Sequence, residues 1–389
     1  MKAIFGDMGY NNRNSKNNIS NLNGSVLPKV HAIQHLGIGV LDHAKNWSFY
    51  RDVLGFTVPV SRDHSEAGRM GALTDGVQKR KVIIALNLLG GAMIEIFTFT
   101  SKEIRPRPEV KWGDTGILGF SLKVIDIDKA CEDLINAGAE IITSPIDMAP
   151  AKKLGWKQMF FKDPDGNILN LIQSDKMNYS LKTRKANIGG IAATTIGVSD
   201  MEKSLDYYKN LLGYNEVIYD WEGKDEGLNK IPGADKKMRR VMLTKPEGST
   251  SLFRYYFEAG MIELVEIKEH IPNQIFAGRG WGDQGIFELC FDVNDIGRTY
   301  ENLVTSGAKP VLEPNIDAFD MGEETTALFG YVNDPDNLFV ELVEIAGFRI
   351  STNFKFDLRK RGAKKPLSPF LLKMLRFAAD KKSPEYFKV

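Results

Sequence analysis

The chain of 389 residues repeats itself at long range, and this repeat constrains its fold more than any other feature. HLGIGVLDHAKNWSFYRDVLGF (35–56) is matched by ATTIGVSDMEKSLDYYKNLLGY (193–214), and WGDTGILGFSLKVIDIDKACEDLINAGAE (112–140) is matched by WGDQGIFELCFDVNDIGRTYENLVTSGAK (281–309). DPDGNILNLIQ, which begins at Asp163, is matched by DPDNLFVELVE, which begins at Asp334. The two halves of the chain therefore share one structural plan.

Each half divides again into two copies of a smaller unit. An apolar strand leads into an amphipathic helix, and three β-rich apolar runs bounded by Gly, Pro and Asp follow. Two positions after the strand-ending valine, each copy has an acidic residue that we expect to cap the helix: Asp42, Asp126, Asp200 and Asp295. The sequence predicts an α+β protein of four βαβββ units, here called units 1 to 4, near residues 31–100, 114–175, 189–269 and 284–346.

The units are expected to form two domains between two unlike ends. A first domain of two units spans residues 29–176, and a second spans 187–346. Residues 1–28 are Asn/Ser-rich, lack the apolar core of a signal peptide and are expected to be flexible. Residues 347–389 hold 12 Lys/Arg against 3 Asp/Glu, and place Phe370, Met374 and Phe377 on one face of a short basic helix. Such a helix packs against its own domain or a partner, or rests on an anionic membrane.

The composition of the chain disfavours nucleic acid and membrane spans and favours a small-molecule partner. The net charge of +1 gives no overall attraction to nucleic acid, and no apolar run approaches the ~20 residues that a membrane span needs. The two cysteines, Cys131 and Cys290, form neither a zinc-binding spacing nor a disulfide framework. We expect a cytoplasmic protein with a small-molecule substrate, without nucleic acid or an integral membrane segment, and compatible with a homodimer.

His35 stands in a predicted strand of small and aliphatic residues, IQHLGIGV. Alternation along the strand places His35, Gly37 and Gly39 on one face. A single histidine in such a strand is usually a core residue bonded to the backbone. A metal site requires other ligand-type residues to converge on the same face.

The motifs HLGIGVLD…FYRDVLGF and DPDGN…LIQ resemble the vicinal oxygen chelate superfamily, which includes glyoxalase I, methylmalonyl-CoA epimerase, extradiol dioxygenases and bleomycin resistance proteins. The resemblance covers about 300 residues and misses both ends of the chain. It implies that paired units curl mixed sheets around two cavities. It also implies that the opening and closing strands of each unit direct one side chain apiece at a metal. Because one scaffold hosts many reactions, the resemblance specifies the fold better than the chemistry.

Aligning the four units locates these eight positions. The opening-strand position lies five residues before the strand-ending valine and holds His35, Gly119, Ala193 and Glu288; the closing-strand position holds Glu95, Asn170, Glu263 and Glu341. Units 1 and 4 thus have ligand-type residues at both positions. A charged glutamate among apolar neighbours is costly to bury unless it is paired or binds a metal. The alternative to metal binding, for any one of these glutamates, is that it lies on an edge strand and faces solvent.

The pairing of the units decides whether a complete site exists. Pairing within each half would give two incomplete cavities. Pairing unit 1 with unit 4, as in tandem glyoxalases, would gather His35, Glu95, Glu288 and Glu341 around one divalent metal ion and leave the other cavity degenerate. We favour the second arrangement, because one complete site beside one degenerate site accounts simply for the pattern of loss.

The expected chemistry is that of a glyoxalase- or epimerase-like isomerase or lyase acting on a small α-oxygenated carbonyl compound. Mn²⁺, Zn²⁺, Ni²⁺, Co²⁺, Mg²⁺ or Fe²⁺ would be the cofactor, with Glu341 as the first candidate for the catalytic base and Glu95 as the second. The alternative is a metal-free binding protein of the bleomycin-resistance type. A ring-cleaving dioxygenase suits the set less well, since Glu288 stands where many members have histidine.

Overall fold

The computed structural model describes residues 29–181, 186–320, 325–351, 354–357, 366–368 and 379. The expected flexible segment 1–28 and the expected helix around Phe370, Met374 and Phe377 lie outside the described residues. Within the described part of the chain, no helix is both long enough and apolar enough to cross a membrane.

The four predicted βαβββ units are confirmed. Unit 1 consists of β1 (Lys29–Gly39), α1 (His43–Asp52), β2 (Val58–Glu66), η1 (Gly68–Leu73), β3 (Lys79–Leu86) and β4 (Met93–Phe99). Unit 2 consists of β5 (Gly116–Val124), α2 (Ile127–Asn136), β6 (Glu140–Ile141), β7 (Ile146–Asp147), η2 (Ala149–Leu154), β8 (Lys157–Lys162) and β9 (Ile168–Gln173).

The second half repeats this order of elements. Unit 3 consists of β10 (Ile188–Gly197), α3 (Met201–Asp206), η3 (Tyr207–Leu211), β11 (Glu216–Gly223), η4 (Glu226–Leu228), β12 (Met238–Thr244) and β13 (Met261–Glu266). Unit 4 consists of β14 (Gly285–Asn294), α4 (Ile296–Thr305), β15 (Lys309–Leu312), β16 (Phe319–Asp320), β17 (Thr326–Asn333) and β18 (Phe339–Ser351), and β19 (Phe354–Asp357) pairs with β18.

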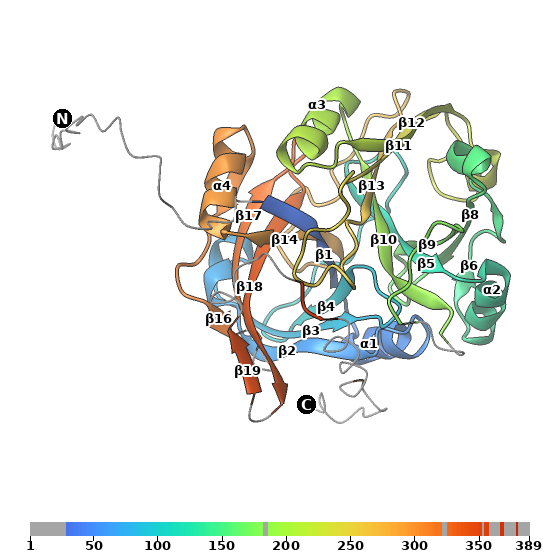
Figure 1. Ribbon diagram of the computed structural model, residues 1–389. Coiled ribbons are helices and arrows are strands. Elements are labelled where there is room, and N and C mark those ends of the chain that lie inside the picture. The colour runs from blue at the N-terminus through green and yellow to red at the C-terminus, as the bar shows by residue number, and fades with distance from the viewer. Residues whose placement is uncertain are drawn as a thin grey trace, which may run out of the picture.

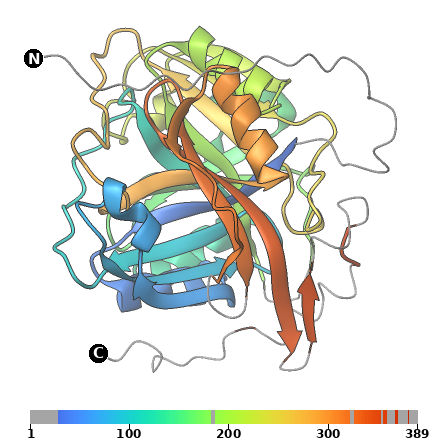
Figure 2. The ribbon, with the colours of Figure 1, turned by 90° about the vertical axis from the view of Figure 1, so that its left-hand side faces the viewer.

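The strands form two sheets, and each sheet takes one unit from each half of the chain. The first has the order β15-β17-β18-β14-β1-β4-β3-β2, and the second has the order β11-β12-β13-β10-β5-β9-β8-β6. In Figure 1 the blue strands of unit 1 accordingly lie beside the orange and red strands of unit 4. Figure 2 shows the same neighbours after a quarter turn. The expected pairing of unit 1 with unit 4 is therefore confirmed.

The main hydrophobic core lies between the two sheets. Leu36 and Ile38 of β1 belong to one buried cluster that includes Phe120 of β5, Ile196 of β10 and Leu289 of β14, so all four units contribute to it. Because successive side chains on a strand point to opposite faces, His35 and Gly37 face away from this core. The shared core holds the two sheets together and leaves their other faces free to line cavities.

Tyrosine–aspartate hydrogen bonds join the two units of each half across the sheets. The hydroxyl of Tyr50 in unit 1 donates to Asp163 in unit 2 at 2.9 Å. The hydroxyl of Tyr208 in unit 3 donates to Asp334 in unit 4 at 3.0 Å. These contacts explain why the DPD motif recurs at the same place in both halves.

Three of the four predicted helix caps are confirmed and one is wrong. Asp42, Asp126 and Asp200 each accept a hydrogen bond from the backbone N–H three residues later. Asp295 makes no such bond, because its backbone is left-handed (φ 48°) and its carboxylate binds Arg298 instead. The carboxylate of Glu344 accepts a hydrogen bond from the first backbone N–H of α4, that of Ile296, at 2.9 Å.

Candidate metal centre

The structure brings the four predicted ligands of units 1 and 4 to one buried centre. The Nε2 atom of His35 lies 3.1 Å from a carboxylate oxygen of Glu95 and 3.3 Å from one of Glu341. An oxygen of Glu288 lies 4.0 Å from the same nitrogen. All four side chains are buried, and they come from the four adjacent strands β18, β14, β1 and β4.

Strand register explains the convergence. Gly37 of β1 is paired with Glu95 on the parallel strand β4 and with Glu288 on the antiparallel strand β14. A Cβ atom at position 37 would lie 2.5 Å from the Oε1 of Glu288. Only glycine fits between the two carboxylates, which explains why residue 37, two positions after His35, is a glycine.

A β-bulge places Gln34 next to His35. Ile33 and His35 pair with the adjacent residues Phe291 and Cys290, so Gln34 is the extra residue of β1. Its Oε1 atom lies 3.0 Å from the Nδ1 of His35. Since an amide oxygen only accepts, Nδ1 donates this bond, and Nε2 is the ring nitrogen that faces the carboxylates and would bind a metal ion. Alternation along an unbroken strand would have put these two residues on opposite faces, so the sequence did not predict this contact.

Glu288 is the most rigidly held of the three carboxylates. Its Oε2 accepts hydrogen bonds from the indole of Trp281 at 2.8 Å and the hydroxyl of Tyr331 at 2.9 Å. Its Oε1 is buried and has no hydrogen-bond partner among the described residues. Burial, together with repulsion from Glu341 and Glu95, raises the pKa of Glu288 well above its ordinary value. Neither aromatic donor was predicted from the sequence.

The electrostatics of the centre call for a cation. Burial alone would lower the pKa of His35, but the adjacent carboxylates of Glu341 and Glu95 outweigh it and raise the pKa to about 10. A proton on His35 therefore partly balances three buried carboxylates, and a divalent cation would replace it with a larger compensating charge. A divalent ion fits this donor set.

Cys290 is a fifth candidate ligand that sequence reasoning missed. His35, Cys290 and Glu341 can each offer one ligand atom within 4.8 Å of the others, as can His35, Glu95 and Glu288. Cys290 stands two residues after Glu288 on β14, so strand alternation was the signal that could have revealed it. Its thiol also donates to the Oε1 of Gln34 at 3.8 Å.

A cavity of about 70 Å³ adjoins the centre. Glu95 and Glu341 line it, together with the aromatic side chains Trp281, Phe329 and Tyr331. The remaining lining residues come from β2, η1 and β3 and the segment between β2 and η1: Ser61, Glu66, Ala67, Gly68, Arg69, Met70, Arg80, Val82 and Ile84. Two of the three carboxylates can therefore meet a small molecule.

Of the corresponding residues of units 2 and 3, Glu263 forms a buried ion pair instead. Arg240 of β12 is fully buried and contacts Glu263 at 2.6 Å and Asp225 at 3.0 Å. The hydroxyls of Tyr219 and Thr195 also donate to Glu263, at 2.7 and 3.0 Å. Asn170 bonds only the hydroxyl of Ser121 among the partners described, at 3.1 Å. The guanidinium thus supplies the positive charge that Glu263 needs, without a metal ion.

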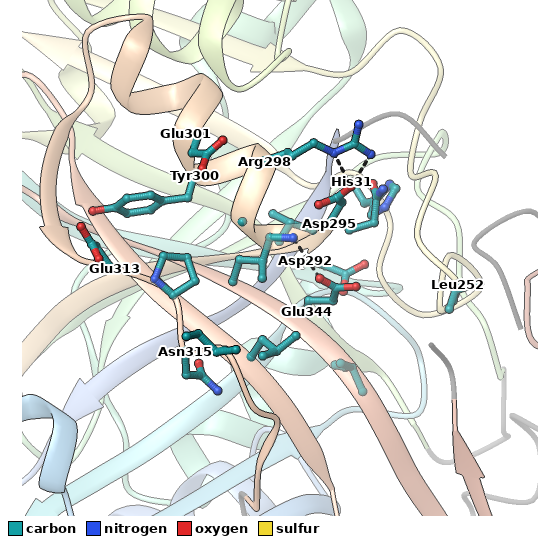
Figure 3. Close-up of a pocket in the computed structure, with 18 of the residues that line it drawn as sticks. His31, Leu252, Asp292, Asp295, Arg298, Tyr300, Glu301, Glu313, Asn315 and Glu344 are labelled. Atoms are coloured by element: carbon teal, nitrogen blue, oxygen red, sulfur yellow. Dashed lines mark hydrogen bonds and ion pairs between the residues drawn. The ribbon is translucent and has the colours of Figure 1, made fainter. Parts of the chain in front are cut away.

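A larger hollow of about 770 Å³ opens elsewhere, where α4 begins (Figure 3). Its acidic side chains include Asp295, which binds Arg298, and Glu344, which caps α4. His31 and Asp292 also line it, and both are buried. None of the four predicted ligands lines this hollow.

Two sheets of paired βαβββ units, one of which cups a His/Glu cluster, define the class of protein. A family model described as the Glyoxalase/Bleomycin resistance protein/Dioxygenase superfamily matches residues 32–171 and 190–342, well over half of the chain. The chain belongs to this superfamily, whose members commonly bind a divalent metal.

The chain is also similar to individual proteins. Uncharacterized protein YaeR of Escherichia coli (strain K12) is 32% identical over 142 residues, which are 36% of this chain and 95% of YaeR. Glyoxalase I from Zea mays aligns with a TM-score of 0.52 and 18% identity over 80% of this chain and 92% of its own. A putative dioxygenase from Bacillus subtilis subsp. subtilis str. 168 aligns with a TM-score of 0.53 and 15% identity over 92% and 99%. At these identities the two structures support the fold alone.

Proposed function

We propose that the protein is a divalent-metal-dependent isomerase or lyase that acts on a small α-oxygenated carbonyl compound. The observation that carries the proposal is the convergence of one imidazole and three carboxylates, from His35, Glu95, Glu288 and Glu341, beside a cavity. This hard, anionic set suits Mn²⁺, Zn²⁺, Ni²⁺, Co²⁺, Mg²⁺ or Fe²⁺. When bound, such an ion would polarise a carbonyl and its neighbouring oxygen and make an adjacent C–H more acidic.

The three carboxylates differ in their freedom to carry a proton. Two hydrogen bonds fix Glu288, which suits a permanent ligand. Glu341 and Glu95 line the cavity, where a substrate C–H can approach them. Glu341 is our first candidate for the base and Glu95 the second. In an isomerisation the same carboxylate would return the proton to the neighbouring carbon; in an epimerisation the other carboxylate would deliver one to the opposite face.

A metal-free binding protein is the second candidate function. The aromatic wall of Trp281, Phe329 and Tyr331 supports it, because such walls are typical of pockets that bind small organic molecules. Ring-cleaving dioxygenase chemistry is less well supported, since the centre contains one imidazole where Fe(II) oxygenases commonly use two.

Glu341→Gln tests the proposed role. Wild-type protein incubated with Mn²⁺, Zn²⁺, Ni²⁺ or Co²⁺ should retain one ion per chain by elemental analysis. It should also exchange the acidic C–H of small α-hydroxy carbonyl compounds with deuterium, as followed by NMR. Glu341→Gln should abolish exchange and weaken metal retention only modestly, because an amide cannot accept the proton near neutral pH. His35→Ala should reduce metal occupancy strongly.

Glu103→Gln, at an exposed position outside the cavity, is the matched control and should leave both measurements unchanged. Wild-type protein that stays metal-free after every incubation would decide for the binding protein. Exchange that persists in Glu341→Gln and disappears in Glu95→Gln would transfer the role of base to Glu95.

A further inference from the structure

Two arginines line the cavity beside the candidate metal centre. Arg69 comes from η1 and Arg80 from β3, and both share the cavity with Glu95 and Glu341. Neither was singled out in the sequence, because the four-unit alignment concerns only opening and closing strands. Their presence beside an otherwise anionic centre requires a physical account.

Arg80 enters the cavity from the end away from the metal centre. It shares one face of β3 with Val82 and Ile84, which also line the cavity, and Ile84 pairs with Glu95. Arg80 precedes Ile84 by four positions on the strand, or about 13 Å between their Cα atoms. One terminal nitrogen of Arg80 binds Asp63 at 2.8 Å, and the side chain is only 13% exposed. Its Nε is buried and has no hydrogen-bond partner among the described residues.

Arg69, like Arg80, lines the cavity and has a hydrogen-bond donor without a protein partner among the described residues. Its guanidinium carbon lies 5.1 Å from the ring centroid of Phe329, and a terminal nitrogen donates to the backbone carbonyl of Glu313. These contacts hold the guanidinium at the cavity wall. Its Nε, too, is buried without a partner in the part of the chain that the structure describes. Buried donors that lack a protein partner are suited to a ligand acceptor.

Charge balance points to the sign of that ligand. Three ionised carboxylates and one divalent ion leave the metal centre with about one negative charge, which disfavours an anionic ligand. At the other end of the cavity Asp63 balances the charge of Arg80, but Arg69 has no carboxylate partner among the described residues, and the acidic lining residue Glu66 is exposed to solvent. The positive charge of Arg69 therefore reverses the sign there. A neutral substrate would need no such reversal.

We propose that the substrate carries an anionic group, a carboxylate or a phosphate, which Arg80 and Arg69 bind while its α-oxygenated carbonyl end reaches the metal centre. The inference rests on the proposed function and specifies its substrate class. The cavity holds about five water-sized groups, so the enclosed part of the substrate is small. Arginine forks bind both carboxylates and phosphates, and the experiment must separate these two sources.

Four ligands that share an α-hydroxy ketone end provide the test. Hydroxyacetone supplies the neutral anchoring end, dihydroxyacetone adds a neutral hydroxyl, 5-hydroxy-4-oxopentanoate adds a carboxylate and dihydroxyacetone phosphate adds a phosphate. Isothermal titration calorimetry on the Mn²⁺-loaded protein should show 5-hydroxy-4-oxopentanoate or dihydroxyacetone phosphate binding about tenfold to a hundredfold more tightly than the two neutral ligands. The stronger of the two anionic ligands identifies the group.

Arg80→Gln and Arg69→Gln should each reduce that preference and leave the affinity for neutral hydroxyacetone unchanged. Arg239→Gln is the matched control, because Arg239 is an ion-paired arginine on the other sheet. Equal affinities for all four ligands in the wild type, or a full preference in both variants, would overturn the anion subsite alone. Wild-type protein that takes up Mn²⁺ and binds none of the four ligands would also overturn it. Failure to take up any metal would overturn the proposed function as well.

Discussion

Replacing Arg240 with methionine would leave two carboxylates without their cation inside the second sheet. The guanidinium is fully buried and lies 2.6 Å from Glu263 and 3.0 Å from Asp225. Removing one partner of a buried ion pair typically costs about 3–5 kcal/mol, because the remaining charge stays desolvated. We expect Arg240→Met to lower the free energy of unfolding by about this amount, measured by urea denaturation with tryptophan fluorescence.

The next residue of the same strand is a matched control. Arg239 also has two acidic partners, Asp220 at 2.8 Å and Glu202, but the partners' side chains are 47% and 75% exposed. Exposed ion pairs contribute about 0–1 kcal/mol, so Arg239→Met should have little effect. Equal destabilisation by the two variants would refute the argument that Arg240 takes the place of a metal as the charge partner of Glu263.

The loss of stability caused by Arg240→Met should also depend on pH. Burial raises the pKa of Asp225, and Arg240 opposes this rise. Without Arg240 the folded protein would hold a proton on Asp225 at pH values where the unfolded chain has lost it. The free energy of unfolding of the variant should therefore fall further below that of the wild type as the pH rises above about 4.

Two other predictions concern the metal centre and the joints between units. Gln34→Leu removes the acceptor for the Nδ1 of His35 and should weaken metal affinity about 10- to 100-fold in competition with a chelator; an unchanged dissociation constant would contradict the orienting role of Gln34. Burial, with repulsion from Asp336, raises the pKa of Asp334 to about 7, so the free energy of unfolding should decrease as the pH rises from about 4 to 7. Asp334→Asn should reduce this slope in urea titrations at several pH values, and an unaltered slope would show that the group does not titrate in this range.

The repeat in the sequence, together with the ligand positions implied by the resemblance to the vicinal oxygen chelate superfamily, was enough to place the four candidate ligands. Because strand alternation has a period of two, a fixed distance from the strand-ending valine assigns His35 and Glu288 to one face. The sequence is compatible with two pairings of the units, since local patterns do not specify which strands are neighbours in a sheet. The loss of ligand-type residues from units 2 and 3 favoured the arrangement that the structure has.

The features missed from the sequence depend on register or on local backbone irregularity. Gln34 contacts His35 only because of a bulge, and Asp295 fails to cap α4 only because its backbone is left-handed. Arg240 reaches Glu263 across neighbouring strands, 23 residues away in the chain, and nothing near Arg240 in the sequence identifies its partner. Such contacts follow from the assembled sheets and could not be read from periodicity.

The pairing of β1 with β14 also affects the order in which the two sheets can form during synthesis on the ribosome. His35 is paired with Cys290 in the sheet. The edge of β1 that pairs with β14 therefore stays unpaired until some 255 further residues (from 35 to 290) have been synthesised. At about 5–20 residues per second the delay is roughly 13–50 s. Units 2 and 3 emerge during this interval, and β5 can pair with β10 before unit 4 exists. The sheet with the buried arginine would then serve as the platform on which the metal-centre sheet closes last.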